Sequence, residues 1–357
     1  MYICKNNNYL ELFPAFRFNL FFILKKKDFY CNQGYNLYKM KKILLLSTIV
    51  FLIFSCDKKS QIEKEVENIP VSIKVERFDK IFYETPISQL GKIKSKYPYF
   101  FPIQTPDSVW TNKMTNPLYR ELYSEVQKKY SNFDKTNADL EALFQHIKFY
   151  FPGTKTPKVV TLISEMDYQN KVIYTDTLVL ISLDLYLGKN HRFYEFPDYL
   201  KQNFEPSQIL PDVVASFAAH KIKPPTDKTL LSQMIYAGKE LYLKDILLPE
   251  ASDEEKIGYK PEQIKWCKEN EGYMWSYFIE GKLLYDSDTK LPNRFINLAP
   301  FSKFYLEIDN QSPGRVGAWI GWQIVRSFME NNPVSIPQLL KIEANELFQK
   351  SKYKPKK

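Results

Sequence analysis

Histidine, cysteine and glycine are scarce in this chain, and each shortage narrows the chemistry that it supports. Its 357 residues include only 3 His, 4 Cys and 11 Gly. The imidazoles of His146, His191 and His220 are far apart in the sequence, and none has a second His at the spacing of a metal site. The few glycines never form a phosphate loop or a dinucleotide fingerprint. We therefore expect no metal and no cofactor.

The cysteines are too few, in the part of the chain that we expect to fold, for a disulfide. Cys4 and Cys31 come before residue 40, and Cys56 follows a segment typical of a lipoprotein signal. Cys267 is then alone and has no disulfide partner. A lone thiol of this kind is typical of a small buried hydrophobic residue rather than a nucleophile.

A bacterial lipoprotein signal peptide is indicated near the N-terminus. Residues 40–42 (Met-Lys-Lys) are positive, residues 43–54 form a short apolar run, and a small residue comes directly before Cys56. We predict residues 40–55 as the signal peptide, with cleavage before Cys56 and acylation of that cysteine. Phe54 departs from the small or β-branched residue that is usual at its position. An uncleaved membrane anchor is the alternative, but the apolar run is short against the ~20 residues of a span.

The signal divides the chain into unequal parts. Residues 1–39 are patternless and a usable Met follows them, so we interpret them as a leader from a misassigned start codon. Residues 56–70 are expected to be a lipid-anchored linker, residues 71–350 a single domain and residues 351–357 a basic tail. The first 55 residues hold 8 Lys/Arg and 2 Asp/Glu, so most of the net charge of +9 precedes the domain. The domain lacks the clustered basic face of a nucleic-acid partner, and we expect none.

Periodicity predicts an α+β fold that is mainly helical, with a small β-sheet and a large helical half. Short β-branched segments indicate strands at residues 71–76, 159–164, 171–176 and 178–185. Helical spacing predicts helices over residues 87–97, 106–112, 117–130, 137–150, 197–203, 211–223, 227–247, 261–280, 315–332 and 336–349.

Glycines gather at the start of the helix predicted over residues 315–332. Gly317 and Gly321 are four residues apart on one helical face. A glycine inside a helix costs up to ~1 kcal/mol, which close approach of another helix would offset. We predict a tight internal helix crossing, with a groove for a partner or ligand as the alternative. The candidate packing or interaction residues are Gly314, Arg315, Gly317, Trp319, Gly321 and Trp322.

Residues 211–249 resemble the core of a group of predicted zinc metallopeptidases with the chemistry missing. In that group a His-Glu-x-x-His helix is followed by a helix that supplies a Glu ligand just before a Gly. The five positions of this motif are occupied here by Ser216, Phe217, Ala218, Ala219 and His220. The residue before Gly238, where the ligand Glu would be, is Ala237. Because one imidazole cannot hold zinc, the resemblance implies a zinc-peptidase-like scaffold that lacks the metal site and has no catalytic residues.

Three later segments resemble the gliding-motility lipoprotein GldB family. They are residues 275–288 (WSYFIEGKLLYDSD), 294–304 (RFINLAPFSKF) and 312–325 (SPGRVGAWIGWQIV). Residues 77–82 and the lipoprotein signal also fit, so the resemblance covers residues 40–350. It implies an envelope component that is required for gliding, is held in a membrane by its N-terminal lipid and works with other envelope proteins of the gliding machinery.

Three hypotheses of function follow. The leading one is a non-catalytic, lipid-anchored component of the gliding machinery, in which a peptidase-like scaffold has become an interaction module; whether the inner or the outer membrane holds it is left open. The alternative is an envelope hydrolase with a relocated site, which would use His220 with an acidic partner such as Glu240. A substrate-binding lipoprotein for a transporter ranks last, because the two-lobed α/β alternation of such proteins is missing.

Overall fold

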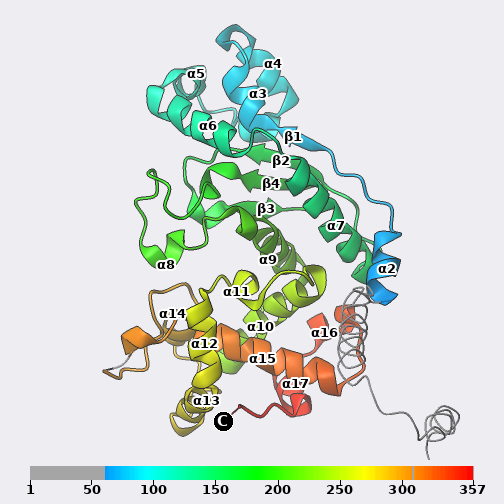
Figure 1. Cartoon of the computed structure of the whole chain (residues 1–357), viewed down its shortest axis with the longest axis vertical. Helices are drawn as coiled ribbons and strands as arrows, with labels where there is room; N and C mark the ends of the chain where they lie inside the picture. The colour runs from blue at the N-terminus through cyan, green and yellow to red at the C-terminus, as the bar shows by residue number, and fades with distance from the viewer. Residues whose placement is uncertain (1–60, 308, 357) are drawn as a thin grey trace, which may run out of the picture. The chain divides into compact units, whose positions relative to one another are not determined.

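A four-stranded mixed sheet organises the first half of the structure, a computed structural model that describes residues 61–307 and 309–356 (Figure 1). Its strands are β1 (Val75–Arg77), β2 (Lys158–Leu162), β3 (Val172–Tyr174) and β4 (Leu178–Ser182). They lie in the order β1-β2-β4-β3. Strands β1, β2 and β4 run parallel, and β3 pairs antiparallel with β4 at one edge. The register places Val159 beside both Val75 and Val179.

Helices cover both faces of this sheet, and its central strands β2 and β4 are accordingly buried and mostly apolar, whereas the edge strand β1 (Val-Glu-Arg) is only partly buried. Val159 belongs to a core that includes residues of α7 (Asp134–Tyr150) and α9 (Ile209–Lys221). The next residue, Val160, belongs to a different core that contains residues of α3 (Phe78–Glu84). Successive side chains of a strand point to opposite faces, so β2 contributes to both cores.

The remaining described chain is mainly helical. Its other α-helices are α2 (Gln61–Glu67), α4 (Leu90–Lys96), α5 (Asp107–Thr115), α6 (Pro117–Lys129), α8 (Asp198–Lys201), α10 (Leu230–Leu247), α11 (Asp253–Ile257), α12 (Pro261–Glu269), α13 (Glu271–Glu280), α14 (Leu291–Phe295), α15 (Val316–Asn331), α16 (Ile336–Lys341) and α17 (Ala344–Ser351). The prediction of a mainly helical α+β fold with a small sheet is confirmed. The likeness to a zinc-peptidase scaffold stays a prediction.

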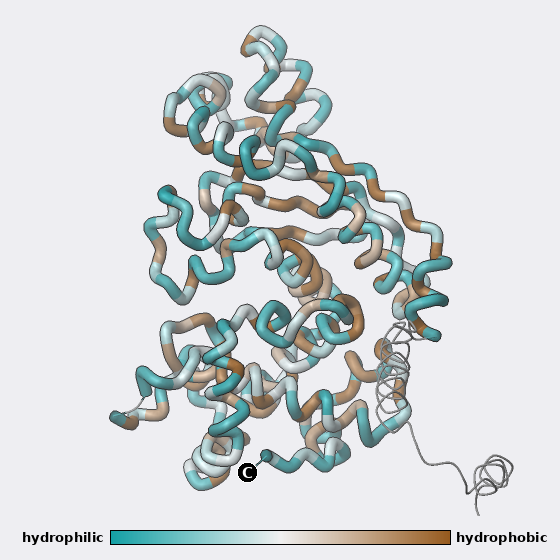
Figure 2. Tube along the Cα trace, viewed as in Figure 1, coloured by the Kyte–Doolittle hydropathy of each residue, from teal (hydrophilic) through white to brown (hydrophobic). Residues whose placement is uncertain are grey.

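The second half is built on the crossing of α10 and α15. Both helices contribute to a third core, in which Met234 of α10 and Trp322 of α15 are fully buried. Figure 2 shows apolar residues gathered along the inner helices, with polar residues on the outer ones. None of the helices within residues 61–307 and 309–356 combines the length and apolar character that a bilayer span requires.

The N-terminal end of the described chain is more ordered than a linker. Residues 61–67, which we expected to be part of the linker, form α2, and its Val66 is only 1% exposed. The side-chain amide of Gln145 on α7 donates to the backbone carbonyls of Glu67 and Ile69, at 3.3 and 3.0 Å. The compact unit therefore begins at Gln61, before the predicted domain boundary at residue 71.

The C-terminal end is likewise packed where a basic tail was expected. Ser351 is the last residue of α17 and is fully buried. The hydroxyl of Tyr353 donates to Oε1 of Glu271 at 2.8 Å, and its ring lies 5.2 Å from that of Trp275, both on α13. The chain therefore folds back onto α13 beyond residue 350.

Two helices that we expected to be continuous are each divided in two. The predicted helix 261–280 is α12 and α13, and the break is at Asn270, whose side-chain amide donates to the carbonyl of Trp266 at 2.9 Å. The backbone N–H of Asn270 donates to the same carbonyl at 3.0 Å, so Asn270 caps the end of α12. The predicted helix 336–349 is α16 and α17, with extended backbone at Ile342 and Glu343 between them.

The starts of two central helices also differ from the prediction. We expected Pro211 to be the first residue of its helix, but α9 begins at Ile209. We expected the next helix to begin at residue 227, but the hydroxyl of Thr229 accepts the Ser232 N–H at 3.3 Å and caps α10, which begins at Leu230. Asp227 accepts the Thr229 N–H at 3.0 Å, so it holds the turn before the cap.

Candidate functional site

The residues at the degenerate metal-site positions of α9 fasten this helix to the sheet. The N–H of Tyr174, on the edge strand β3, donates to the Ser216 hydroxyl at 2.9 Å. Phe217 is fully buried, with its ring centroid 5.2 Å from that of Tyr174 and 5.3 Å from that of Phe151. The serine satisfies a donor on a sheet edge, and the phenylalanine fills the space behind it. Both side chains are therefore part of the packing of α9.

His220 lies in the last turn of α9, where the helix dipole favours a basic side chain. Its Nε2 is 3.1 Å from Oδ1 of Asp176, which follows β3. The Nζ of Lys221 is 3.8 Å from the same oxygen. The side chains of His220 and Asp176 are 42% and 68% exposed, so solvent reaches both partners. A pair with this exposure contributes about 0–1 kcal/mol to stability.

The other residues of the predicted site do not join this pair. Ala237 is buried within α10, at 8% exposure. Glu240, the partner that the hydrolase hypothesis gives to His220, forms an ion pair of 3.2 Å with Lys244 on its own helix. Within the part of the chain that the structure describes, no three or more His, Cys, Asp and Glu side chains are grouped as metal ligands.

A surface groove of about 550 Å³ opens beside Asp176 and Lys221. Several separate segments form it: the end of α7 with the loop that follows, the β3–β4 turn, the end of α9, and α16. The lining residues are Tyr150, Phe151, Pro152, Gly153, Thr154, Lys155, Asp176, Thr177, Lys221 and Pro337. Aromatic rings and prolines are combined here with two lysines and one carboxylate, which suits a ligand that has an apolar part and a negative charge. We take this groove, with the His220–Asp176 pair at its border, as the candidate site.

The glycine-rich segment lies away from the groove, at a close approach of two helix backbones. A Cβ placed on Gly321 would collide with the carbonyl of Met234 on α10. A Cβ placed on Gly238 would collide with the carbonyl of Gly321. The two helices can cross this closely only because both positions lack a side chain. Trp319 and Trp322 are 2% and 0% exposed at this crossing, within the third core.

Gly314, Arg315 and Gly317 shape the start of α15. Arg315 has φ of 66°, a left-handed conformation, and its Nη1 donates to the carbonyl of Ile257 at 2.9 Å. A Cβ on Gly314 would collide with the carbonyl of Ala299. A Cβ on Gly317 would lie 3.0 Å from the carbonyl oxygen of Phe295. These residues therefore determine how α15 meets the chain that precedes it.

A charged cluster that was not predicted from the sequence joins three helices. Arg326 on α15 binds both carboxylate oxygens of Asp245 on α10, each at 2.7 Å. It also binds both oxygens of Asp253 on α11, at 2.7 and 3.1 Å. The guanidinium lies 3.7 Å from the ring centroid of Trp322, and Lys256 is 3.2 Å from Asp245. The spacing of Trp322 and Arg326, one helical turn apart, is the one signal in the sequence that could have indicated this cluster.

A second cluster, also not predicted from the sequence, follows the ends of the parallel strands. The carboxylate of Asp184, after β4, is fully buried and accepts the N–H groups of Ser164 and Met166 at 2.9 and 2.7 Å. Burial raises the pKa of Asp184 to about 6, although these hydrogen bonds act in the opposite direction. Glu165 and Met166 have φ of 60° and 64°, so the carboxylate holds a left-handed turn in place.

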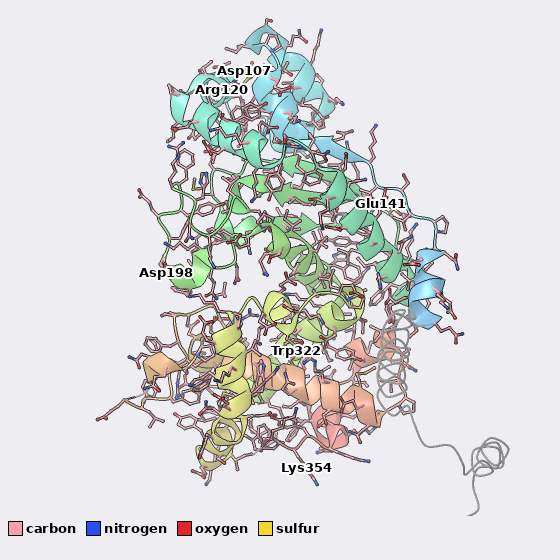
Figure 3. All side chains as sticks on the ribbon, viewed as in Figure 1. Asp107, Arg120, Glu141, Asp198, Trp322 and Lys354 are labelled. Atoms are coloured by element: carbon pink, nitrogen blue, oxygen red, sulfur yellow. The ribbon has the colours of Figure 1, made fainter. Side chains whose placement is uncertain are left out.

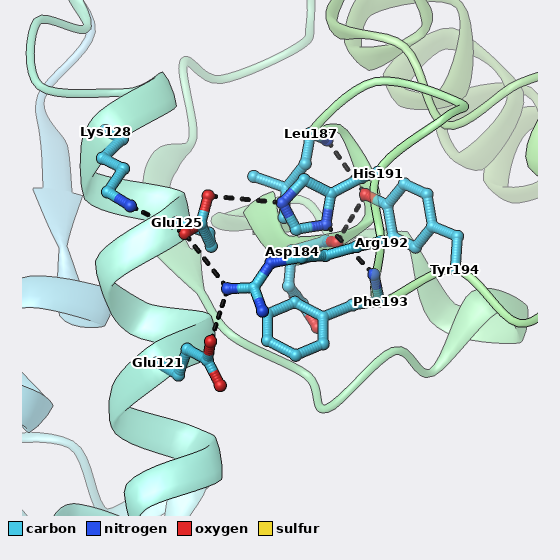
Figure 4. A network of polar contacts seen from close by, with 9 residues as sticks. All are labelled: Glu121, Glu125, Lys128, Asp184, Leu187, His191, Arg192, Phe193 and Tyr194. Atoms are coloured by element: carbon cyan, nitrogen blue, oxygen red, sulfur yellow. Dashed lines mark hydrogen bonds and ion pairs between the residues drawn. The ribbon is translucent and has the colours of Figure 1, made fainter.

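His191 and Arg192 extend this second cluster to α6 (Figure 4). The Nε2 of His191 lies 3.5 Å from Oε2 of Glu125, and Arg192 contacts both Glu121 and Glu125. The hydrogen bond from Lys128, followed by those from His191 and Arg192, lowers the pKa of Glu125 to about 2. Arg192 and Lys128 face the carboxylates of α6, and Asp184 is held by backbone N–H groups. We therefore regard the cluster as a fastening between this loop and α6 rather than as a binding site.

The fold and the groove together define a mainly helical α+β domain with a surface groove at the end of α9. Residues 59–355 match the family model described as Gliding motility protein GldB, and the chain belongs to this family. The resemblance to the GldB family is thereby confirmed, and the family description gives the chain a role in gliding motility. Neither the comparison with curated proteins nor that with solved structures gives a match.

Proposed function

We propose that this protein is a lipid-anchored component of the gliding apparatus, acting in the cell envelope by binding other proteins of that apparatus rather than by catalysis. Family membership supports the motility role. The observation that carries the non-catalytic part is the use of the motif positions for packing. The Ser216 hydroxyl accepts a strand N–H, and Phe217 is fully buried. A general base must reach the reacting atoms, and neither position provides one.

The lipid anchor is the second part of the proposal. Cys56 and the signal before it lie outside the described residues. The sequence of residues 40–56 supports the anchor, and so does membership of a family whose name indicates a lipoprotein. A Cys56→Ala variant is expected to fold but to leave the membrane fraction after cell breakage. Immunoblotting of membrane and soluble fractions tests this, and a variant that stays in the membrane pellet contradicts the anchor.

Complementation of a deletion strain tests the motility role and the absence of catalysis together. Wild-type, His220→Ala and Asp176→Ala genes are returned to the strain, and spreading on agar and movement on glass are measured. We expect the deletion to stop movement and all three genes to restore it. Movement without the gene would contradict the motility role. Failure of the His220→Ala gene, at wild-type protein level, would show that His220 is required, and assays of turnover by the purified protein would then separate catalysis from binding.

A hydrolase is the alternative, and one observation favours it. The His220–Asp176 pair, at 3.1 Å, borders the groove, and an imidazole oriented by a carboxylate is a component of many hydrolytic sites. The alternative requires turnover of a peptide or ester by the purified protein, with loss of that turnover in His220→Ala. A purified wild-type protein without turnover on such substrates would leave binding as the function.

A further inference from the structure

The tether between the predicted lipid and the folded unit is shorter than the sequence suggests, because α2 is fixed to α7. Val66 on α2 is buried at 1% exposure. Nε2 of His146 on α7 lies 3.3 Å from Oε1 of Glu63, and Gln145 holds the carbonyl of Glu67 at the other end of α2. Only residues 57–60 therefore separate Cys56 from the folded unit.

A tether of this length leaves the unit little freedom of position. A fully extended chain spans at most ~3.6 Å per residue, so Cys56 lies within about 18 Å of Gln61 by any path. A compact unit of about 300 residues has a radius of gyration of about 19 Å. The tether is thus no longer than the radius of the unit. An acylated Cys56 would hold the end of the molecule that carries α2 close to the bilayer.

The candidate groove lies at this end of the molecule. His146, which contacts α2, and Tyr150, which lines the groove, are four residues apart on α7 and so share one face of the helix. Figure 1 shows α2 beside the C-terminal half of α7, and Figure 3 labels Glu141, whose carboxylate accepts the N–H of Ile73 on the chain that leads away from α2. The root of the tether and the groove are therefore neighbours.

The groove itself suits a phospholipid surface, whereas the neighbouring α2 is acidic, with three Glu and one Lys. Tyr150 and Phe151 are half-buried and offer aromatic rings, which are favoured at the membrane–water interface. Ile62 on α2 is 46% exposed. Lys155 and Lys221 supply positive charge, which attracts anionic headgroups. Asp176 is the carboxylate that lines the groove, and it already faces His220 and Lys221.

We propose that the groove faces the bilayer in the anchored protein, and that its aromatic and lysine side chains contact anionic phospholipid headgroups. This inference rests on the lipid anchor of the proposed function. The end of the molecule that carries α2 then faces the membrane, and protein partners would bind to surfaces far from α2.

Fluorescence quenching by headgroup-labelled lipids tests the proposal. The full-length lipoprotein is extracted from membranes with a single reactive cysteine at Thr154→Cys in the groove or at Ile103→Cys, which is fully exposed between α4 and α5. Cys267 is buried and does not compete for the label. In protein-free vesicles that contain anionic lipid, we expect severalfold stronger quenching at Thr154→Cys than at Ile103→Cys.

A charge variant tests the contact with headgroups separately from the tether. Lys155→Glu should reduce quenching at Thr154→Cys, whereas the matched Lys129→Glu on α6 should leave it unchanged. Equal quenching at the two labelled sites, or no effect of Lys155→Glu, would overturn the proposal. The cysteine at Thr154→Cys could also be protected from the label in native membranes but not in vesicles of lipid alone. In that case a protein covers the groove, and the lipid proposal fails. Mass spectrometry of the N-terminal peptide shows independently whether Cys56 is acylated, so failure of the anchor is distinguishable from failure of the orientation.

Discussion

The crossing of α10 and α15 and the outer end of α9 differ in how much change their residues can tolerate. At the crossing, Gly238 and Gly321 lie backbone against backbone, with no room for a Cβ at either. At the end of α9, His220 and Asp176 meet through exposed side chains. The most distinctive sequence pattern thus belongs to packing, whereas the groove lies among residues without a recognisable motif. Packing therefore constrains the residues at the crossing, whereas the exposed residues at the end of α9 are available for binding.

The largest effect is expected from a side chain at the crossing. In Gly321→Ala the new Cβ would collide with the backbone carbonyl of Met234, which cannot rotate away. We expect a loss of more than ~3 kcal/mol of unfolding free energy, through overpacking. Urea denaturation, or the yield of folded protein where the loss is complete, measures it. Gly91→Ala on α4 is the control, because nothing lies within 4 Å of its added Cβ. Equal stability of the two variants would show that the crossing is loose.

A somewhat smaller effect is expected from the cluster that joins the crossing to α11. Arg326→Lys keeps a charge but cannot bind Asp245 and Asp253 through two bonds each. We expect a loss of about 2–4 kcal/mol, because one of the partly buried carboxylates is left without its partner. Lys350→Ala, which removes an exposed ion pair with Glu346, should cost less than about 0.5 kcal/mol. If thermal denaturation shows the same loss of stability in these two variants, the cluster does not stabilise the contact between the three helices.

The sequence predicted more of the fold than of the site, for physical reasons. Helices and strands repeat their apolar residues at fixed periods, so α15 and the buried strand β2 were visible in the sequence. The Arg326 cluster is assembled by residues 73 and 81 positions apart, and no period links them. The groove is similar, since Lys155 and Lys221 become neighbours only when α7 and α9 pack together. Short helices such as α11 and α14 were missed because five residues carry no period.

A pH-dependent effect is expected at Asp184, smaller than the effect at the Arg326 cluster and larger than the effect at His220. Its folded pKa of about 6 is above the ordinary value, so protons bind the folded state more tightly than the unfolded state. The stability from this group is therefore fully present below about pH 4 and is lost as the pH rises through 6, by about 2–3 kcal/mol. In Asp184→Asn this dependence should disappear. The wild type should exceed the variant in unfolding free energy by more at pH 4.5 than at pH 7.5. A difference that is constant with pH would contradict the assignment.

The smallest effect is expected at the end of α9, where the comparison with the crossing is sharpest. His220→Ala removes one exposed partner of Asp176, and Lys221 remains 3.8 Å from that carboxylate. We expect a change below about 1 kcal/mol in unfolding free energy, because solvent screens an exposed pair. Phe217→Ala, one turn earlier on the same helix but fully buried, should cost about 3–5 kcal/mol. Urea denaturation of both variants separates the two sides of α9. A large loss in His220→Ala would mean that this end of the helix is held as tightly as the crossing, and that the groove beside it is a structural seam rather than a binding surface.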